Sequence, residues 1–127
     1  MILGIGIDLI DIRRIDALLD EKFIRRIFTA EEQQLCDGRE MRAASYAKRF
    51  AAKEACAKAL GCGIGADALF REIEVVNNER GAPHLVLHGA AMARLKLLTP
   101  PGKTAHLFLS LSDDAPYAMA QVIIEAI

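Results

Sequence analysis

The stretch RAASYAKRFAAKEACAK, from Arg42 to Lys58, contains five basic residues and a single acid, Glu54. It is rich in alanine and has neither proline nor glycine, and this continues to Leu60. Such a composition favours a helix, and Gly61 is of the residue type that most often ends one. The sequence therefore predicts one long helix from Arg42 to Leu60.

This predicted helix sets one carboxylate among cations. At 3.6 residues per turn, Phe50, Glu54 and Lys58 project along one line of its surface, and alanines at every fourth position from 47 to 59 form a narrow stripe that another element can approach closely. A lone carboxylate among cations suggests a site for a polyanion together with a metal ion. The alternative is an ordinary i,i+4 pair between Glu54 and Lys58, worth only about 0.3–0.5 kcal/mol.

The chain begins with ILGIGIDLIDI, residues 2–12, whose alternation predicts a strand. Gly4, Gly6 and Asp8 then lie on one face, and the large apolar residues lie on the other. The glycines permit close approach of a ligand or backbone, and a carboxylate in an apolar run is costly unless it is paired, hydrogen-bonded or metal-bound. Asp8 is also a candidate helix cap, but Asp11 is better placed to cap the helical spacing that follows. We therefore interpret Asp8 as a functional residue.

The remaining patterns predict an α+β fold. Thr29 and Glu32 form a capping-box signature for a short helix that ends at Gly38. Residues 71–89 predict two strands around a turn, residues 90–98 a helix, and residues 104–125 a hairpin whose second arm has one covered face. The expected architecture is a small antiparallel sheet with a long central helix and shorter helices.

Length and charge limit the possible functions. A chain of 127 residues has room for one domain, residues 1–127. Its net charge of -1 argues against bulk binding to nucleic acid or to an anionic membrane. The N-terminal apolar run is broken by Asp8 and Asp11 and lacks a basic flank and a cleavage pattern, so we expect neither a signal peptide nor a membrane span, and a cytoplasmic location.

Three segments together resemble the holo-[acyl-carrier-protein] synthase family, the small 4'-phosphopantetheinyl transferases. They are GIGIDLIDIRRI (residues 4–15), RFAAKEACAKALG (residues 49–61) and SLSDDAPYAMAQVIIE (residues 110–125). The most specific part of the resemblance is an early Asp, here Asp8, combined with a K-E-A-x-x-K helix, here Lys53 to Lys58.

The resemblance implies a transferase of fatty acid biosynthesis. Members of this family transfer 4'-phosphopantetheine from coenzyme A to a serine of apo acyl carrier protein, release adenosine 3',5'-bisphosphate, use Mg²⁺ and assemble as trimers with active sites at subunit boundaries. By position, Asp8 and Glu54 correspond to the metal ligands, and Lys58 to the lysine near the transferred phosphate. Mg²⁺ prefers one or two carboxylates plus phosphate oxygens and waters, which agrees with this set. The serine proton acceptor is either Glu54 or a metal-bound water.

Glycine residues follow the predicted helix as GCGIG, with Gly61, Gly63 and Gly65. Taken alone, this spacing suits a helix C-cap and turn as well as a phosphate-binding loop. The resemblance places these glycines near the coenzyme A phosphates and implies that Arg49 and Lys48 are partners for the nucleotide phosphates, with a solvated helix face as the alternative for Lys48. Lys53 is assigned to the same coenzyme A site.

Two arginine doublets, Arg13–Arg14 and Arg25–Arg26, lie in a basic amphipathic segment with helical spacing between Ile12 and Phe28. The alternative is a surface helix with solvated arginines, because three acids between the doublets dilute the charge. The resemblance favours docking of the acidic acyl carrier protein on these four arginines.

One position departs from part of the family. Some relatives carry a histidine at the tip of the last hairpin, where this chain has Asp113, so we assign Asp113 no catalytic role. Two other functions remain as alternatives: a non-catalytic oligomeric scaffold that binds a nucleotide, and a purely structural protein.

Overall fold

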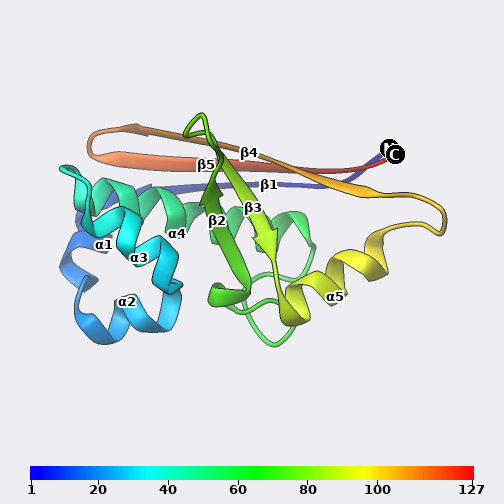
Figure 1. Cartoon of the computed structure of the whole chain (residues 1–127), viewed down its shortest axis with the longest axis horizontal. Helices are drawn as coiled ribbons and strands as arrows, with labels where there is room; N and C mark the ends of the chain where they lie inside the picture. The colour runs from blue at the N-terminus through cyan, green and yellow to red at the C-terminus, as the bar shows by residue number, and fades with distance from the viewer.

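The computed structural model describes all residues, 1–127, as a three-stranded sheet, a two-stranded sheet, five α-helices and one short 3₁₀ helix (Figure 1). In chain order the elements are β1 (Ile2–Asp11), α1 (Ile12–Leu18), α2 (Glu21–Ile27), α3 (Ala30–Asp37), α4 (Arg42–Ala59), η1 (Phe70–Glu72), β2 (Ile73–Asn77), β3 (Pro83–Leu87), α5 (Gly89–Leu98), β4 (Ala105–Asp114) and β5 (Tyr117–Ala126). The α+β prediction is confirmed. No helix combines the length and hydrophobicity needed to cross a membrane.

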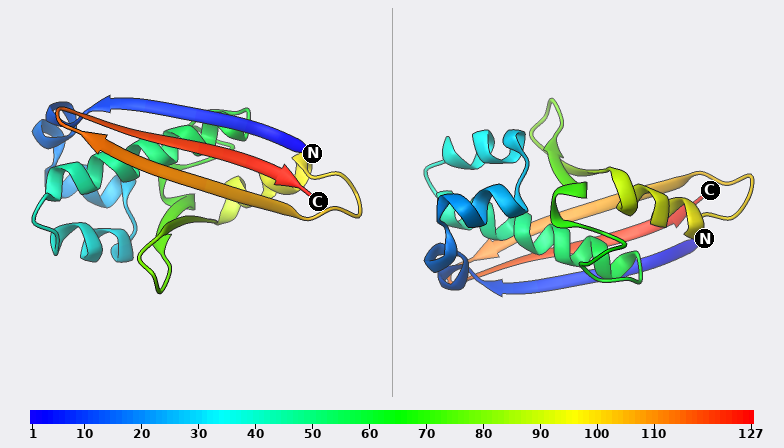
Figure 2. Two further views of the ribbon diagram at one scale, coloured as in Figure 1. Left: turned by 90° about the horizontal axis from the view of Figure 1, so that it is seen from above. Right: turned by 90° about the horizontal axis from the view of Figure 1, so that it is seen from below.

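The larger sheet has the order β1-β5-β4, with both neighbouring pairs antiparallel. The helices all lie on one side of it, and α4 runs along this inner face (Figures 1 and 2). Alternate residues of β5 between Ala118 and Ala126 are buried on this face, as the alternation of the second hairpin arm predicted. The alanine stripe of α4 at positions 47, 51, 55 and 59 is also buried.

The two glycines of β1 allow α4 to pack directly against the strand. A Cβ atom at Gly4 would overlap with the carbonyl group of Ala59, and one at Gly6 with that of Ala55. Only glycine therefore permits this approach of backbone to backbone. The close contact brings the next residue on the same face of β1, Asp8, up to the side chains of α4.

The helical segment after β1 differs from the predicted continuous pattern. It forms two short helices, because Asp20 adopts an extended conformation and its side chain accepts a hydrogen bond from the backbone of Phe23, which starts α2. Asp11 caps α1 through the backbone of Arg13, as predicted. The capping box of Thr29 and Glu32, the β2–β3 hairpin, α5 and the β4–β5 hairpin are confirmed.

The outer face of the larger sheet has no element over it (Figure 2). Its β1 side is apolar, whereas β4 and β5 also present polar residues there, among them Ser110 and Gln121. Ile5, Ile7 and Leu9 of β1 and Phe108 of β4 are each more than half exposed. Ile5 and Phe108 both lie opposite Ile123 of β5 in the register, so these side chains form one continuous patch.

Candidate functional site

Asp8, Glu54 and Lys58 come together where β1 crosses α4. The Lys58 ammonium donates to Asp8 Oδ1 at 3.2 Å and to the carbonyl oxygen of Ile7 at 2.9 Å. Lys58 thus forms its ion pair with Asp8 rather than with Glu54, which contradicts the alternative of a simple i,i+4 pair on a helix surface. The Asp8 side chain is 17% exposed and that of Lys58 is 51% exposed, so the group lies at the surface with its carboxylate partly shielded.

Glu54 is electrostatically unsatisfied in this group. Burial raises the pKa of Glu54, the charge of Asp8 raises it further, and Lys58 only partly offsets both. Two carboxylates close enough to raise a pKa in this way favour binding of a further cation.

These two carboxylates could hold a hard divalent ion only with help from other ligands. No group of three or more His, Cys, Asp or Glu side chains gathers anywhere in the chain. Mg²⁺ is commonly bound by one or two carboxylates, with waters and substrate phosphate oxygens completing the octahedron. The donor set of Asp8 and Glu54 fits that mode of binding and does not fit a cage made by the protein alone.

The glycine segment after α4 directly follows the helix C-cap residue, Leu60. Gly61 and Gly63 have positive φ angles of 77° and 68°, and their amides donate to the carbonyls of Lys58 and Ala57. The amide of Gly65 donates to Ala68. The amides of these three glycines are therefore used within the chain, but a Cβ at Gly63 or Gly65 would meet no atom within 4 Å. The loop surface is open to a ligand, although these amides are not free donors.

Lys53 lies apart from this group, in the core. Its side chain is 0% exposed, and its ammonium donates to Glu32 Oε1 at 2.8 Å and to the carbonyls of Phe70 and Ile73 at 3.0 and 2.6 Å. A lysine ammonium has three donors, and all three are used. The expectation that Lys53 contacts coenzyme A needs correction, because the side chain has neither a free donor nor a path to solvent.

Arg49 lines a small cationic pocket of about 160 Å³. Its side chain is buried, with the whole residue 3% exposed; Nη1 donates to the Ser45 carbonyl, while Nε has no partner. Asn77 Oδ1, in the same pocket, is also without a partner. Arg39 and Lys48 contribute two more cations, and Lys48 is held by Asp113 at 2.9 Å.

A buried guanidinium that has no acidic partner and lies beside other cations is suited to bind an anion. The sequence indicated Arg49 but not Arg39 or Asn77, which lie in a turn and at a strand end. No local pattern marks either of them, since only the fold brings them to the pocket.

The four predicted docking arginines are all exposed on α1 and α2. Arg13 is paired with Asp11 at 2.6 Å, and Arg25 with Glu21 at 3.1 Å, whereas Arg14 and Arg26 form no ion pair. Hydrogen bonds from Arg13 lower the pKa of Asp11 to about 2, so the Asp11 carboxylate stays ionised and largely neutralises the charge of Arg13.

A row of stacked aromatic rings leads from α2 to the site. Phe23 stacks on Phe50 with centroids 6.3 Å apart, and Phe50 stacks on Phe70 of η1 at 5.4 Å. Phe50 is one helical turn before Glu54 on α4, so the row joins the arginine-bearing helices to the carboxylates. The sequence indicated Phe50 but did not identify this row.

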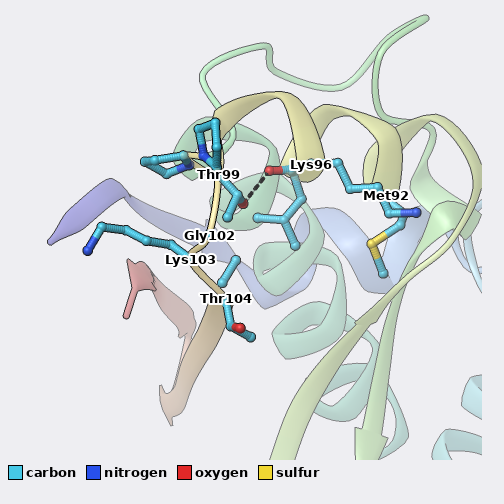
Figure 3. A pocket seen from close by; sticks show the side chains of 10 residues that line it. Met92, Lys96, Thr99, Gly102, Lys103 and Thr104 are labelled. Carbon is cyan, nitrogen blue, oxygen red and sulfur yellow. Dashed lines mark hydrogen bonds between the residues drawn. The ribbon is translucent and has the colours of Figure 1, made fainter.

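Another pocket, of about 460 Å³, lies between α5 and the start of β4 (Figure 3). Lys96, Thr99 and Lys103 are among the residues around it, and the hydroxyl of Thr99 donates to the Leu95 carbonyl at 2.7 Å. None of the residues predicted from the sequence lines this pocket.

The chain belongs to the 4'-phosphopantetheinyl transferase superfamily, whose family profile matches residues 4–120. It is 56% identical over 130 residues to the holo-[acyl-carrier-protein] synthase of Phenylobacterium zucineum strain HLK1, with 100% of this chain and 94% of the relative covered.

Solved structures agree with this placement. The holo-[acyl-carrier-protein] synthase of Neisseria meningitidis is 35% identical, with a TM-score of 0.86 and coverage of 98% of this chain and 99% of that one. The enzyme of Bacillus anthracis strain Ames, crystallised in complex with CoA (3',5'-ADP), is 39% identical, with a TM-score of 0.79 and coverage of 98% and 96%.

Proposed function

We propose that this protein transfers the 4'-phosphopantetheine group of coenzyme A to a serine hydroxyl of apo acyl carrier protein, with Mg²⁺, and acts in fatty acid biosynthesis in the cytoplasm. The observation that carries the proposal is the group of Asp8, Glu54 and Lys58 at the crossing of β1 and α4, in a chain whose relatives bear this activity in their names. We treat residues 1–127 as one catalytic domain.

The reaction breaks the phosphoanhydride bond of coenzyme A and forms a phosphodiester to serine. The serine oxygen attacks the phosphorus that bears pantetheine, the pyrophosphate P–O bond breaks, and adenosine 3',5'-bisphosphate leaves. Asp8 and Glu54 would hold Mg²⁺, which when bound neutralises charge on the pyrophosphate. Lys58, half exposed beside Asp8, is placed to donate to a phosphate oxygen as negative charge develops. Glu54, with its raised pKa, is suited to accept the serine proton directly or through a water.

We assign the nucleotide phosphates of coenzyme A to the glycine loop (Gly61, Gly63, Gly65) and to the cationic pocket of Arg49. The unpartnered Nε of Arg49 and its low exposure support binding of an anion there. Lys53 is omitted from this assignment, since its donors are all used in the core.

Docking of the acidic carrier protein is assigned to α1 and α2. Arg14 and Arg26 are the strongest candidates because no acid pairs with them, and Arg13 and Arg25 contribute less. The aromatic row of Phe23, Phe50 and Phe70 extends from this surface toward Glu54, which supports delivery of the acceptor serine from that side.

We infer a homotrimer with active sites at subunit boundaries. The exposed apolar side chains of β1 on the outer face of the sheet support an assembly, because monomeric proteins rarely expose a large contiguous apolar patch. Further copies of this chain would cover Ile5, Ile7 and Leu9.

The deciding experiment is mass spectrometry of apo acyl carrier protein after incubation with the protein, coenzyme A and Mg²⁺. The expected result is a mass increase of one phosphopantetheine group, with release of adenosine 3',5'-bisphosphate. Asp8→Asn should lose this activity while remaining folded, and Glu31→Gln, an exposed acid on α3, serves as the matched control. Binding of coenzyme A with no mass change on any carrier protein would favour the alternative of a non-catalytic scaffold.

A further inference from the structure

Arg94 of α5 reaches across to the end of α4. Its Nε donates to the carbonyl oxygen of Leu60 at 2.9 Å, and Leu60 is the C-cap residue of α4. The guanidinium also lies against Gly61, where an added Cβ would be 3.4 Å from Arg94 Nη2. Arg94 therefore contacts the start of the glycine loop.

Most of the hydrogen-bonding capacity of Arg94 is unused. A guanidinium has five N–H donors, and only Nε has a partner in the chain. Arg94 takes part in none of the ion pairs, unlike Arg13, Arg25 and Arg42. Neither Nη atom is among the buried polar atoms that lack a partner, so both keep access to solvent.

The charge of Arg94 matters because of its position. The C-terminal end of a helix carries a partial negative charge, equivalent to roughly half an electron, and this disfavours a phosphate. Lys58 lies one turn before Gly61, whose amide donates to the Lys58 carbonyl, but the Lys58 ammonium is already bonded to Asp8. A pyrophosphate approaching this end of α4 needs another cation, and Arg94 is an unpaired one.

We propose that Arg94 is a phosphate-binding residue of the coenzyme A site: its Nε fixes the end of α4, and its Nη groups donate to a phosphate oxygen held over the glycine loop. This inference rests on the proposed function. The flat, forked guanidinium can bond the Leu60 carbonyl and an anion at once, which a lysine ammonium of similar reach does less well. Because Gly61 has no side chain, the Arg94 guanidinium has room beside it.

Titration calorimetry in the presence of excess Mg²⁺ tests this role, with adenosine 3',5'-bisphosphate and inorganic pyrophosphate as probes. Arg94→Gln should raise the Kd of both probes about 10- to 100-fold, the loss expected for a charge-assisted hydrogen bond. Arg94→Lys keeps the charge and should give a smaller loss. Lys96→Gln removes a charge from the same helix at the edge of the other pocket and should leave both Kd values unchanged.

A second readout separates ligand binding from helix capping. If Arg94 is only a cap, Arg94→Gln lowers the melting temperature but leaves the Kd values as they are, and the proposal is overturned. If Arg94→Gln does not fold, Arg94→Lys decides, since a Kd equal to that of the wild type refutes a role for the fork. Failure of the wild type to bind coenzyme A or modify carrier protein would instead refute the proposed function, independently of Arg94.

Discussion

Replacing Lys53 by methionine tests whether this lysine serves the fold or the nucleotide. Methionine preserves most of the side-chain volume and removes the ammonium, so packing changes little. The carboxylate of Glu32 is then left buried, with only the backbone amides of Thr29 and Val75 as donors at 2.8 and 2.9 Å. Two carbonyl oxygens, of Phe70 and Ile73, also lose their ammonium donor.

Removing one partner of a buried ion pair costs about 3–5 kcal/mol. The two amides that remain on Glu32 soften this loss, so we expect a fall of about 3 kcal/mol in the free energy of unfolding. Typical domains are stable by only about 5–15 kcal/mol, so the change is large but survivable. Adding Glu32→Gln to Lys53→Met should recover part of the loss, because no charge then remains buried.

Urea denaturation at a fixed protein concentration measures the effect, with Lys103→Met, an exposed lysine, as the control. The control should change the free energy of unfolding by less than about 0.5 kcal/mol. The affinity of folded Lys53→Met for coenzyme A should equal that of the wild type. A loss of stability below about 1 kcal/mol together with weakened coenzyme A binding would refute this reasoning and restore Lys53 to the nucleotide site.

Three further predictions concern the crossing of β1 and α4 and the outer sheet face. Gly6→Ala forces a Cβ into the Ala55 carbonyl, so α4 must shift; overpacking of this kind costs about 1–3 kcal/mol, and both stability and transfer activity should fall, with unchanged melting contradicting the close approach. The raised pKa of Glu54 means that the folded state holds this proton more tightly than the unfolded state, so ionisation costs stability as pH rises through the range between the two pKa values. In EDTA, the melting temperature of Glu54→Gln relative to that of the wild type should therefore rise between acid and neutral pH. A difference in melting temperature that stays constant with pH would contradict the raised pKa of Glu54. Ile7→Glu, on the outer face, should yield monomers in sedimentation, and an unchanged mass would show that this face is not the interface.

The sequence by itself determined the elements with strong local signals. The helix from Arg42 onward, the caps at Asp11 and Thr29, and the two hairpins follow from composition, capping chemistry and period-2 alternation, all of which act over a few residues. The residues alone singled out Asp8 and the Glu54–Lys58 pair separately, and their grouping was predicted only through the resemblance to the holo-[acyl-carrier-protein] synthase family.

The tertiary structure decided which side of each element faces inward. Lys53 and Lys58 lie on the same helix, yet one is buried against Glu32 and the other reaches solvent beside Asp8. A polar residue type predicts exposure for both, and only the packing of η1 and β2 against α4 tells them apart. The alternation of β1 shows that its two faces differ, but not that the glycine face is the inner one. That outcome depends on the close contact between two backbones, which leaves room for hydrogen atoms only and turns the larger side chains, such as Ile7, outward. Arg94 and Phe70 likewise contact α4 only because segments distant in the sequence pack together, and no local sequence pattern predicts those contacts.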